Sequence, residues 1–146
     1  MRIDIKTFDA LTSKELYNIL QLRSEIFVVE QDCVYQDIDG KDERSLHIIG
    51  YTDEKLVAYA RCFKPGDYFD EAAIGRVLVR ENYRKFGYGH EITKAAIAAI
   101  KTNFKADKIK ISAQIYLIIF YESHGFKTVG DRYLEDGIPH ITMIKA

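Results

Sequence analysis

The stretch Arg84-Lys85-Phe86-Gly87-Tyr88-Gly89 separates two apolar segments of different periodicity. A strand-like run, Ile74 to Val79, precedes it, and an apolar repeat at helical spacing, Ile92 to Ile100, follows it. Glycines let the backbone approach an anion closely, and the unpaired amides and dipole of a helix start supply positive charge. The strand, turn and helix together predict a phosphate-binding loop.

Two common phosphate-binding patterns do not fit this loop. A Walker A loop needs GxxxxGK followed by Ser or Thr, and the chain has no such string. A dinucleotide fingerprint needs GxGxxG, but after Gly87 and Gly89 the third glycine position is Ile92. No ribose-binding acid follows a second strand in the expected place, so the sequence argues against a nicotinamide cofactor.

The segments before the loop predict a strand, a helix and a hairpin. The first six residues alternate polar and apolar, as a strand does. Thr12 and Glu15 have the spacing of a capping box, so a helix should begin there. Its apolar face would contain Leu16, Ile19, Leu20 and Phe27. Residues 27–44 are mixed and acidic, which indicates a loop or a broken helix; residues 46–51 and 56–63 follow as a hairpin.

The segments after the loop continue the alternation of helix and strand. The helix that the loop begins should bury small and apolar side chains, namely Ile92, Ala95, Ala96, Ala99 and Ile100. Residues 108–113 alternate with a period of two, which predicts a strand, and Gln114 to His124 predicts a helix that ends at Gly125. Residues 126–129 and 140–144 predict two last strands, joined by a polar turn at 135–139.

Composition sets limits on the class of protein. A chain of 146 residues with 47% hydrophobic and 29% charged residues fits a single domain, residues 1–146, with its own core. The net charge of -1 predicts no recruitment of nucleic acid or of an anionic membrane. No stretch is apolar enough for a membrane span, and we expect a cytoplasmic protein. The two cysteines, Cys33 and Cys62, have no metal-ligand spacing, so we expect reduced thiols and no metal.

Five strings carry a resemblance to a known family. The loop has the pattern R-x-x-G-x-G, with Arg84, Gly87 and Gly89 at the fixed positions. Gln114 is followed seven residues later by Tyr121 and then by Gly125-Phe126. The chain thereby resembles the GNAT superfamily of N-acetyltransferases. The remaining strings, at 27–31, 35–42 and 135–140, resemble its ElaA-type branch.

The resemblance implies a fold and a donor. The fold would be α/β (α+β): a central, mixed, mostly antiparallel twisted sheet of about six to seven strands, splayed in the middle and flanked by about four helices. The donor would be acetyl-CoA, with no metal, and its pyrophosphate would lie on the loop. The implied coenzyme A contacts are the backbones of Val77, Leu78 and Val79, the loop residues Arg84, Lys85, Phe86, Gly87, Tyr88, Gly89 and His90, and the later motif residues Gln114 and Tyr121.

The resemblance makes Tyr121 the candidate catalytic acid, which would protonate the leaving thiolate of coenzyme A. A thiol has a reference pKa of about 8.5 and tyrosine one of about 10, so full proton transfer in water would be uphill by roughly 2 kcal/mol. Tyr121 would therefore act mainly as a hydrogen-bond donor. If residues 114–124 are helical, Gln114, Leu117 and Tyr121 share one face.

The residues that would bind the acceptor are less defined by the sequence. A carboxylate, a histidine or a water chain could take the proton of the amine. The candidates in polar segments or next to the central strand are Glu30, Asp37, Arg76, Glu135 and His140. Carboxylates in polar loops are more often solvated or turn-forming. Arg76 could bind an acceptor carboxylate or pair with one of these acids.

The leading hypothesis is a direct acetyl transfer from acetyl-CoA to the amine of a small molecule or a protein. The alternative is a coenzyme A-binding module without catalysis, which would regulate a partner or sense acyl-CoA. The sequence does not distinguish a monomer from a homodimer, and it predicts neither a nucleic-acid nor a membrane partner.

Overall fold

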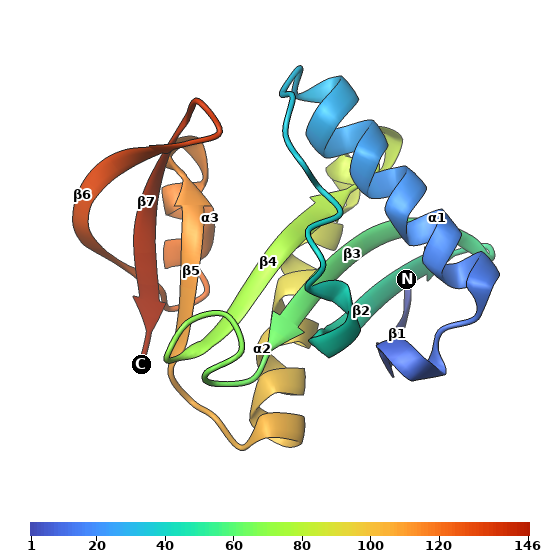
Figure 1. Ribbon diagram of the computed structural model, residues 1–146, viewed down its shortest axis with the longest axis horizontal. Coiled ribbons are helices and arrows are strands. Elements are labelled where there is room, and N and C mark those ends of the chain that lie inside the picture. Colours follow the sequence, from blue (N-terminus) through green and yellow to red (C-terminus); the bar gives the residue numbers. More distant parts are fainter.

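The computed structural model describes all 146 residues, and its seven strands form one sheet in the order β1-β2-β3-β4-β5-β7-β6 (Figure 1). Neighbouring strands are antiparallel except for β4 and β5, which are parallel. The predicted mixed, mostly antiparallel sheet is therefore confirmed. The strands are β1 (Arg2–Thr7), β2 (Leu46–Thr52), β3 (Lys55–Phe63), β4 (Ala72–Val79), β5 (Ile109–Gln114), β6 (Lys127–Glu135) and β7 (Ile138–Lys145).

The sheet is split between its two parallel strands. β4 and β5 pair only at Ala72 with Ile109 and at Ala73 with Lys110, and Figure 1 shows the two strands diverging from that point. Beyond Ala73 the edge of β4 that faces β5 has no strand partner. The predicted splay is thus present, and it divides the sheet into a β1–β4 part and a β5–β7 part.

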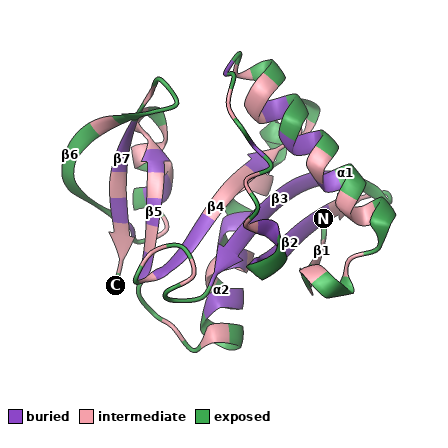
Figure 2. Ribbon diagram, in the orientation of Figure 1, coloured by how far each residue is buried: buried purple, intermediate pink, exposed green.

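Helices cover both faces of the larger part. Helix α2 (Tyr88–Phe104) buries Ile92, Ala96, Ala99 and Ile100 in a core with β2, β3 and β4, as its sequence predicts. Helix α1 (Ser13–Arg23) and the π-helical turn η2 (Ser24–Glu30) pack a second, smaller cluster on the opposite face. Figure 2 shows that the buried residues concentrate on the central strands, whereas β6 is mostly exposed. None of the helices has the length and apolarity that a membrane span requires.

The start of α1 follows the predicted capping box. The Glu15 amide donates to Thr12 Oγ1 at 3.1 Å, and the Thr12 amide donates to Glu15 Oε1 at 2.9 Å. The helical region changes from α1 to the π-helical η2 and continues to Glu30. Of the two alternatives predicted for residues 27–44, a broken helix therefore describes residues 27–30, and the loop begins at Gln31.

The segment from Gln114 to His124 corrects a prediction. Gln114 is the last residue of β5, a 3-10 turn covers Ile115–Leu117, and only Ile118–Glu122 forms helix α3. The argument from one shared helical face is therefore wrong. The extended backbone of Gln114 continues the ladder with β7, where it pairs with His140, and this tertiary pairing overrides the local helical spacing.

The last hairpin is longer than predicted. β6 extends to Glu135 and β7 begins at Ile138, so the turn itself is Asp136-Gly137. Both turn residues have positive φ, 51° and 77°, which matches the twist of a two-residue hairpin.

Candidate active site

The glycine loop begins helix α2 with unpaired amides. Gly87 precedes the helix with a φ of 74°, and the first helical bonds run from the amides of His90 and Glu91 to the Gly87 carbonyl. The amides of Gly87, Tyr88 and Gly89 therefore lie ahead of the bonded turns, where the helix dipole is positive. No atom lies within 4 Å of the position that a Gly87 Cβ would occupy. The loop therefore leaves these amides unpaired and open to a ligand.

The charged side chain of the loop motif is already partnered. Arg84 Nε donates to the Val79 carbonyl at 2.9 Å, and its Nη2 lies 2.7 Å from Glu30 Oε2. Arg84 therefore ties the loop to the end of β4 and to η2. Glu30, a predicted acceptor residue, therefore lies beside the glycine loop, and it does not line the pocket between β4 and β5 that is described below.

The other loop residues have separate surroundings. Lys85 and Phe86 are exposed, and the Lys85 ammonium lies 5.4 Å from the centroid of the Phe86 ring. The ring of Tyr88 stacks on that of Tyr83, with the two centroids 6.4 Å apart. His90 Nδ1 lies 2.9 Å from His124 Nε2, so these two imidazoles share one hydrogen bond beside the loop. Beside the open amides, Lys85 makes no ion pair, and only the Nε2 atom of His90 is without a hydrogen-bond partner.

A bulge interrupts β4 at the split. Tyr59 pairs with Leu78 and Arg61 with Gly75, so Arg76 and Val77 together stand opposite Ala60. Arg76 has a φ of 52°, in the left-handed region that non-glycine residues rarely adopt.

The bulge determines which β4 side chains face the gap. In a regular strand, successive side chains point to opposite faces, yet both Arg76 and Val77 line the pocket. Leu78 points into the second core cluster, and Val79 packs at the edge of the main core.

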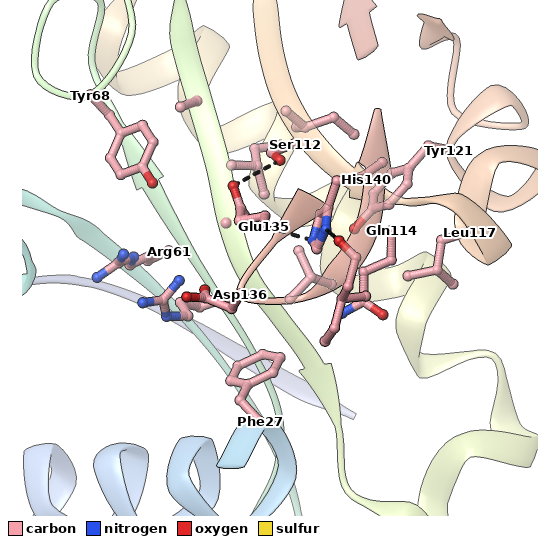
Figure 3. Close-up of a pocket in the computed structure, with 18 of the residues that line it drawn as sticks. Phe27, Arg61, Tyr68, Ser112, Gln114, Leu117, Tyr121, Glu135, Asp136 and His140 are labelled. Atoms are coloured by element: carbon pink, nitrogen blue, oxygen red, sulfur yellow. Dashed lines mark hydrogen bonds and ion pairs between the residues drawn. The ribbon is translucent and has the colours of Figure 1, made fainter. Parts of the chain in front are cut away.

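A pocket with a volume of about 150 Å³ lies in the gap between β4 and β5. Figure 3 shows Tyr121, His140 and Gln114 on one side of it, and Arg61 and Tyr68 on the other. The structure thus brings together six of the predicted site residues, Arg76, Val77, Gln114, Tyr121, Glu135 and His140.

Tyr121 lies near the end of α3, with its ring buried against Phe120 and Phe126. Burial raises the pKa of its phenol above the ordinary value, and no hydrogen bond from the protein opposes this effect. Among the fully enclosed side-chain nitrogen and oxygen atoms, only Arg61 Nε lacks a hydrogen-bond partner. The Tyr121 oxygen also lacks a partner in the protein, so it is not fully enclosed and is open to the pocket. Tyr121 is a neutral hydroxyl that is free to donate to a bound group.

Two further predicted residues form a pair on the β5–β7 side. His140 Nε2 lies 3.3 Å from Glu135 Oε2, and the Ser112 hydroxyl donates to Glu135 Oε1 at 3.1 Å. His140 Nδ1 lies 2.7 Å from the Ile138 carbonyl, and its ring stacks on Tyr133.

Asp37 corrects the expectation that the loop carboxylates are solvated. Its side chain is 5% exposed and accepts hydrogen bonds from Arg23 Nε at 3.0 Å and Arg76 Nε at 2.8 Å. Asp42 and Asp39 bind the guanidinium of Arg61 in the same network. Asp37 is therefore a buried structural partner of Arg76, and Arg76 pairs with loop acids and not with a free carboxylate.

Several pocket residues were not identified from the sequence, among them Cys33, Tyr35, Arg61, Tyr68 and Ser112. Two signals were available. Arg61 is a cation inside an apolar central strand, where a buried charge needs a partner. Ser112 alternates in phase with Gln114 along β5, so the period of two places both on one face. Tyr68 and Cys33 lie in connecting segments whose course depends on tertiary contacts.

The comparisons with known proteins agree with this geometry. Residues 12–146 match the family described as "Acetyltransferase (GNAT) domain". Protein ElaA of Escherichia coli is 42% identical over 137 residues, which cover 92% of this chain and 90% of ElaA.

Two crystal structures cover nearly the whole chain. That of E. coli ElaA superposes with a TM-score of 0.93 at 38% identity over 99% of both chains. That of an acyl-CoA N-acyltransferase from Pseudomonas aeruginosa superposes with a TM-score of 0.92 at 40% identity over 100% of both chains. The chain belongs to the GNAT acetyltransferase family and is a homologue of ElaA.

Proposed function

We propose that this protein transfers the acetyl group of acetyl-CoA directly to the amine of an acceptor. The observation that carries the proposal is the pocket in the β4–β5 gap, which has a free buried hydroxyl inside it and an open anion-binding loop beside the end of β4. An anionic, elongated thioester is the kind of donor that these features fit.

The donor fits three features of the chain. The open amides of Gly87, Tyr88 and Gly89 suit a pyrophosphate, because they present backbone donors at the positive end of α2. The unpaired edge of β4, which includes Val77 to Val79, offers backbone groups to the amides of a pantetheine arm. The bulge at Arg76 and Val77 lies where that arm would end, beside the pocket.

Acetyl-CoA supplies an activated carbonyl, and the chain supplies hydrogen-bond donors to its oxygen and to the leaving sulfur. Backbone amides freed by the bulge can donate to the carbonyl oxygen as negative charge develops there. Tyr121 can donate to the sulfur as the carbon–sulfur bond breaks. Since burial raises the pKa of Tyr121, the hydroxyl acts by hydrogen bonding more than by complete proton transfer.

The test combines two measurements on the wild-type protein. Isothermal titration with acetyl-CoA should show saturable binding, and incubation with a panel of primary amines should release free thiol with formation of the acetylated amine. Binding without release of thiol for any amine would favour the alternative, a coenzyme A sensor without catalysis. Absence of acetyl-CoA binding would overturn both.

A covalent acetyl-enzyme is not part of the proposal. The thiol of Cys62 is fully buried, and burial raises its pKa, so it is a poor nucleophile. The thiol of Cys33 lines the pocket, where it donates to the Asp136 carbonyl at 3.4 Å, and direct attack by the amine needs no contribution from it. Mass spectrometry after a rapid mix with acetyl-CoA alone should therefore show unmodified protein, and stoichiometric acetylation of a cysteine would contradict direct transfer.

A further inference from the structure

Glu135 and His140 are the only predicted acceptor residues that remain available inside the pocket. Glu30 pairs with Arg84 at the loop, Asp37 is enclosed by Arg23 and Arg76, and Arg76 itself is paired with Asp37 and Asp39. Glu135, by contrast, has Ser112 and His140 as the only hydrogen-bond and ion-pair partners of its side chain, which is 47% exposed.

The hydrogen bonds of His140 leave one position for a proton. A carbonyl oxygen can only accept, so Nδ1 carries a hydrogen that it donates to Ile138. Nε2 faces the Glu135 carboxylate at 3.3 Å, so a hydrogen is needed between these two atoms. A second proton on the ring supplies one, and when the ring carries only one proton, a bound ammonium group can donate to both atoms. The pair therefore offers two hydrogen-bond acceptors to an ammonium group.

The charges around the pocket support a cationic ligand. On the β4 side, the guanidinium groups of Arg23, Arg61 and Arg76 are matched by three carboxylates, those of Asp37, Asp39 and Asp42. On the β5–β7 side, Glu135 and Asp136 line the pocket with only His140 as a basic group, and no lysine lines it. The unmatched charge of the pocket is negative.

The remaining walls suit an apolar body. Phe63, Tyr68 and Phe69 form a chain of aromatic contacts with centroids 5.0 Å and 4.7 Å apart. The pocket volume of about 150 Å³ is the size of a cavity that holds a single benzene ring. A carboxylate next to the amine would be brought against Glu135 and Asp136, where like charges repel.

From this arrangement we infer that Glu135 and His140 form the acceptor subsite, which binds a small primary ammonium with an apolar or aromatic body and no adjacent carboxylate. This inference rests on the proposed acetyl transfer. One proton passes from the ammonium to His140 Nε2, and Glu135 stabilises the imidazolium that results. The nitrogen lone pair then forms the carbon–nitrogen bond, and the carbon–sulfur bond breaks. The second proton leaves nitrogen as the amide forms and is taken up by the sulfur beside Tyr121.

The experiment measures ligand binding and turnover separately. The probes are 2-phenylethylamine and L-phenylalanine, which share a ring and an amine and differ by a carboxylate. Titrated into the protein saturated with coenzyme A, 2-phenylethylamine should bind at least tenfold more tightly than phenylalanine. With acetyl-CoA, the ratio of their kcat/KM values should favour 2-phenylethylamine by the same factor or more. Equal affinities, or tighter binding of phenylalanine, would overturn the inference.

Substitutions of Glu135 and His140 test their two roles separately, ammonium binding by Glu135 and proton acceptance by His140. Glu135→Gln keeps an acceptor for Ser112 but removes the charge, so the Kd of 2-phenylethylamine should rise about 10- to 100-fold, the effect of losing a hydrogen bond to a charged group. Asp131→Asn removes an exposed carboxylate from the same strand outside the pocket and should leave this Kd unchanged. His140→Asn keeps a donor for Ile138 but removes Nε2, so kcat should fall about 100-fold, as for loss of a general base, with a smaller change in Kd.

The outcomes separate the subsite from the proposed function. Amine binding that depends on Glu135 without any acetylation would support the subsite and count against acetyl transfer. Acetylation of other acceptors with unchanged 2-phenylethylamine binding in Glu135→Gln would support the transferase and overturn the subsite. Coenzyme A affinity should be unchanged in every variant, which shows that the donor site is intact.

Discussion

Asp37 holds the bulge of the central strand through Arg76, across 39 residues of sequence. Its Oδ1 accepts from Arg76 Nε at 2.8 Å, its Oδ2 accepts from Arg23 Nε at 3.0 Å, and its carbonyl accepts from both guanidinium groups. Arg76 is the residue with the left-handed backbone at the split of the sheet. The acidic loop therefore stabilises the strained backbone beside the proposed acetyl position.

Asp37→Asn should destabilise the fold strongly. Removing one partner of a buried ion pair leaves uncompensated charge, which typically lowers the free energy of unfolding by about 3–5 kcal/mol. Tyr35→Phe, which removes only the hydroxyl that donates to Asp37 Oδ1 at 3.0 Å, should lower it by about 1 kcal/mol. Urea titrations monitored by circular dichroism check both values. Equal stability of Asp37→Asn and wild type would contradict the role of Asp37.

Tyr121→Phe should lower kcat by about 10- to 1000-fold, the range expected for loss of one hydrogen-bond donor to developing charge. Its stability and acetyl-CoA affinity should be nearly unchanged, because the hydroxyl has no protein partner. Tyr116→Phe is the control, since that tyrosine is 73% exposed in the preceding turn. Thiol-release kinetics and acetyl-CoA titration separate the two effects. Unchanged kcat in Tyr121→Phe would remove this residue from the mechanism.

Gly87→Ala should weaken coenzyme A binding by about tenfold or more, because a side chain at a φ of 74° costs about 1 kcal/mol and shifts the amides of the loop. Gly130→Ala is a matched control: Gly130 has a φ of 75°, also with no atom within 4 Å of the Cβ position, and lies on β6. The two variants should lose similar stability in thermal unfolding, and only Gly87→Ala should change the Kd of coenzyme A. If both bind coenzyme A like wild type, the loop is not the anion site.

The acid network should make stability depend on pH in the acid range. Burial alone would raise the pKa of Asp39, but the hydrogen bonds and charge of Arg61 outweigh burial and hold this pKa well below its ordinary value. The pKa of Asp42 is likewise lowered, because Arg23 and Arg61 outweigh its burial.

A carboxyl whose folded pKa is lowered stabilises the fold above its unfolded pKa of about 3.9, and this stabilisation is lost as the pH falls toward the folded value. The free energy of unfolding should therefore decrease from about pH 5 downward. Asp39→Asn should be less stable at pH 7 and show a shallower acid dependence, as measured by urea unfolding at several pH values. Parallel pH curves for the two proteins would contradict this assignment.

Local patterns in the sequence predicted much of the fold correctly. The capping box at Thr12 and Glu15, the hairpin around 52–55 and the buried face of α2 depend on short-range spacing, which the residues themselves specify. The glycine loop was identified for the same reason, because Gly87 and the helix after it are adjacent in the chain.

Tertiary contacts determined the features that residue spacing in the sequence does not specify. Gln114 has helical spacing to Tyr121 but extends β5, since its pairing with His140 of β7 outweighs the local preference. Asp37 lies in a polar segment but is buried, because Arg23 and Arg76 approach it from α1 and β4. Likewise, the sequence offered several acids and one histidine as acceptor residues. The folded chain neutralises Glu30 and Asp37 with arginines and leaves Glu135 with His140 in the pocket, since electrostatic pairing depends on distances that only the packed sheet sets.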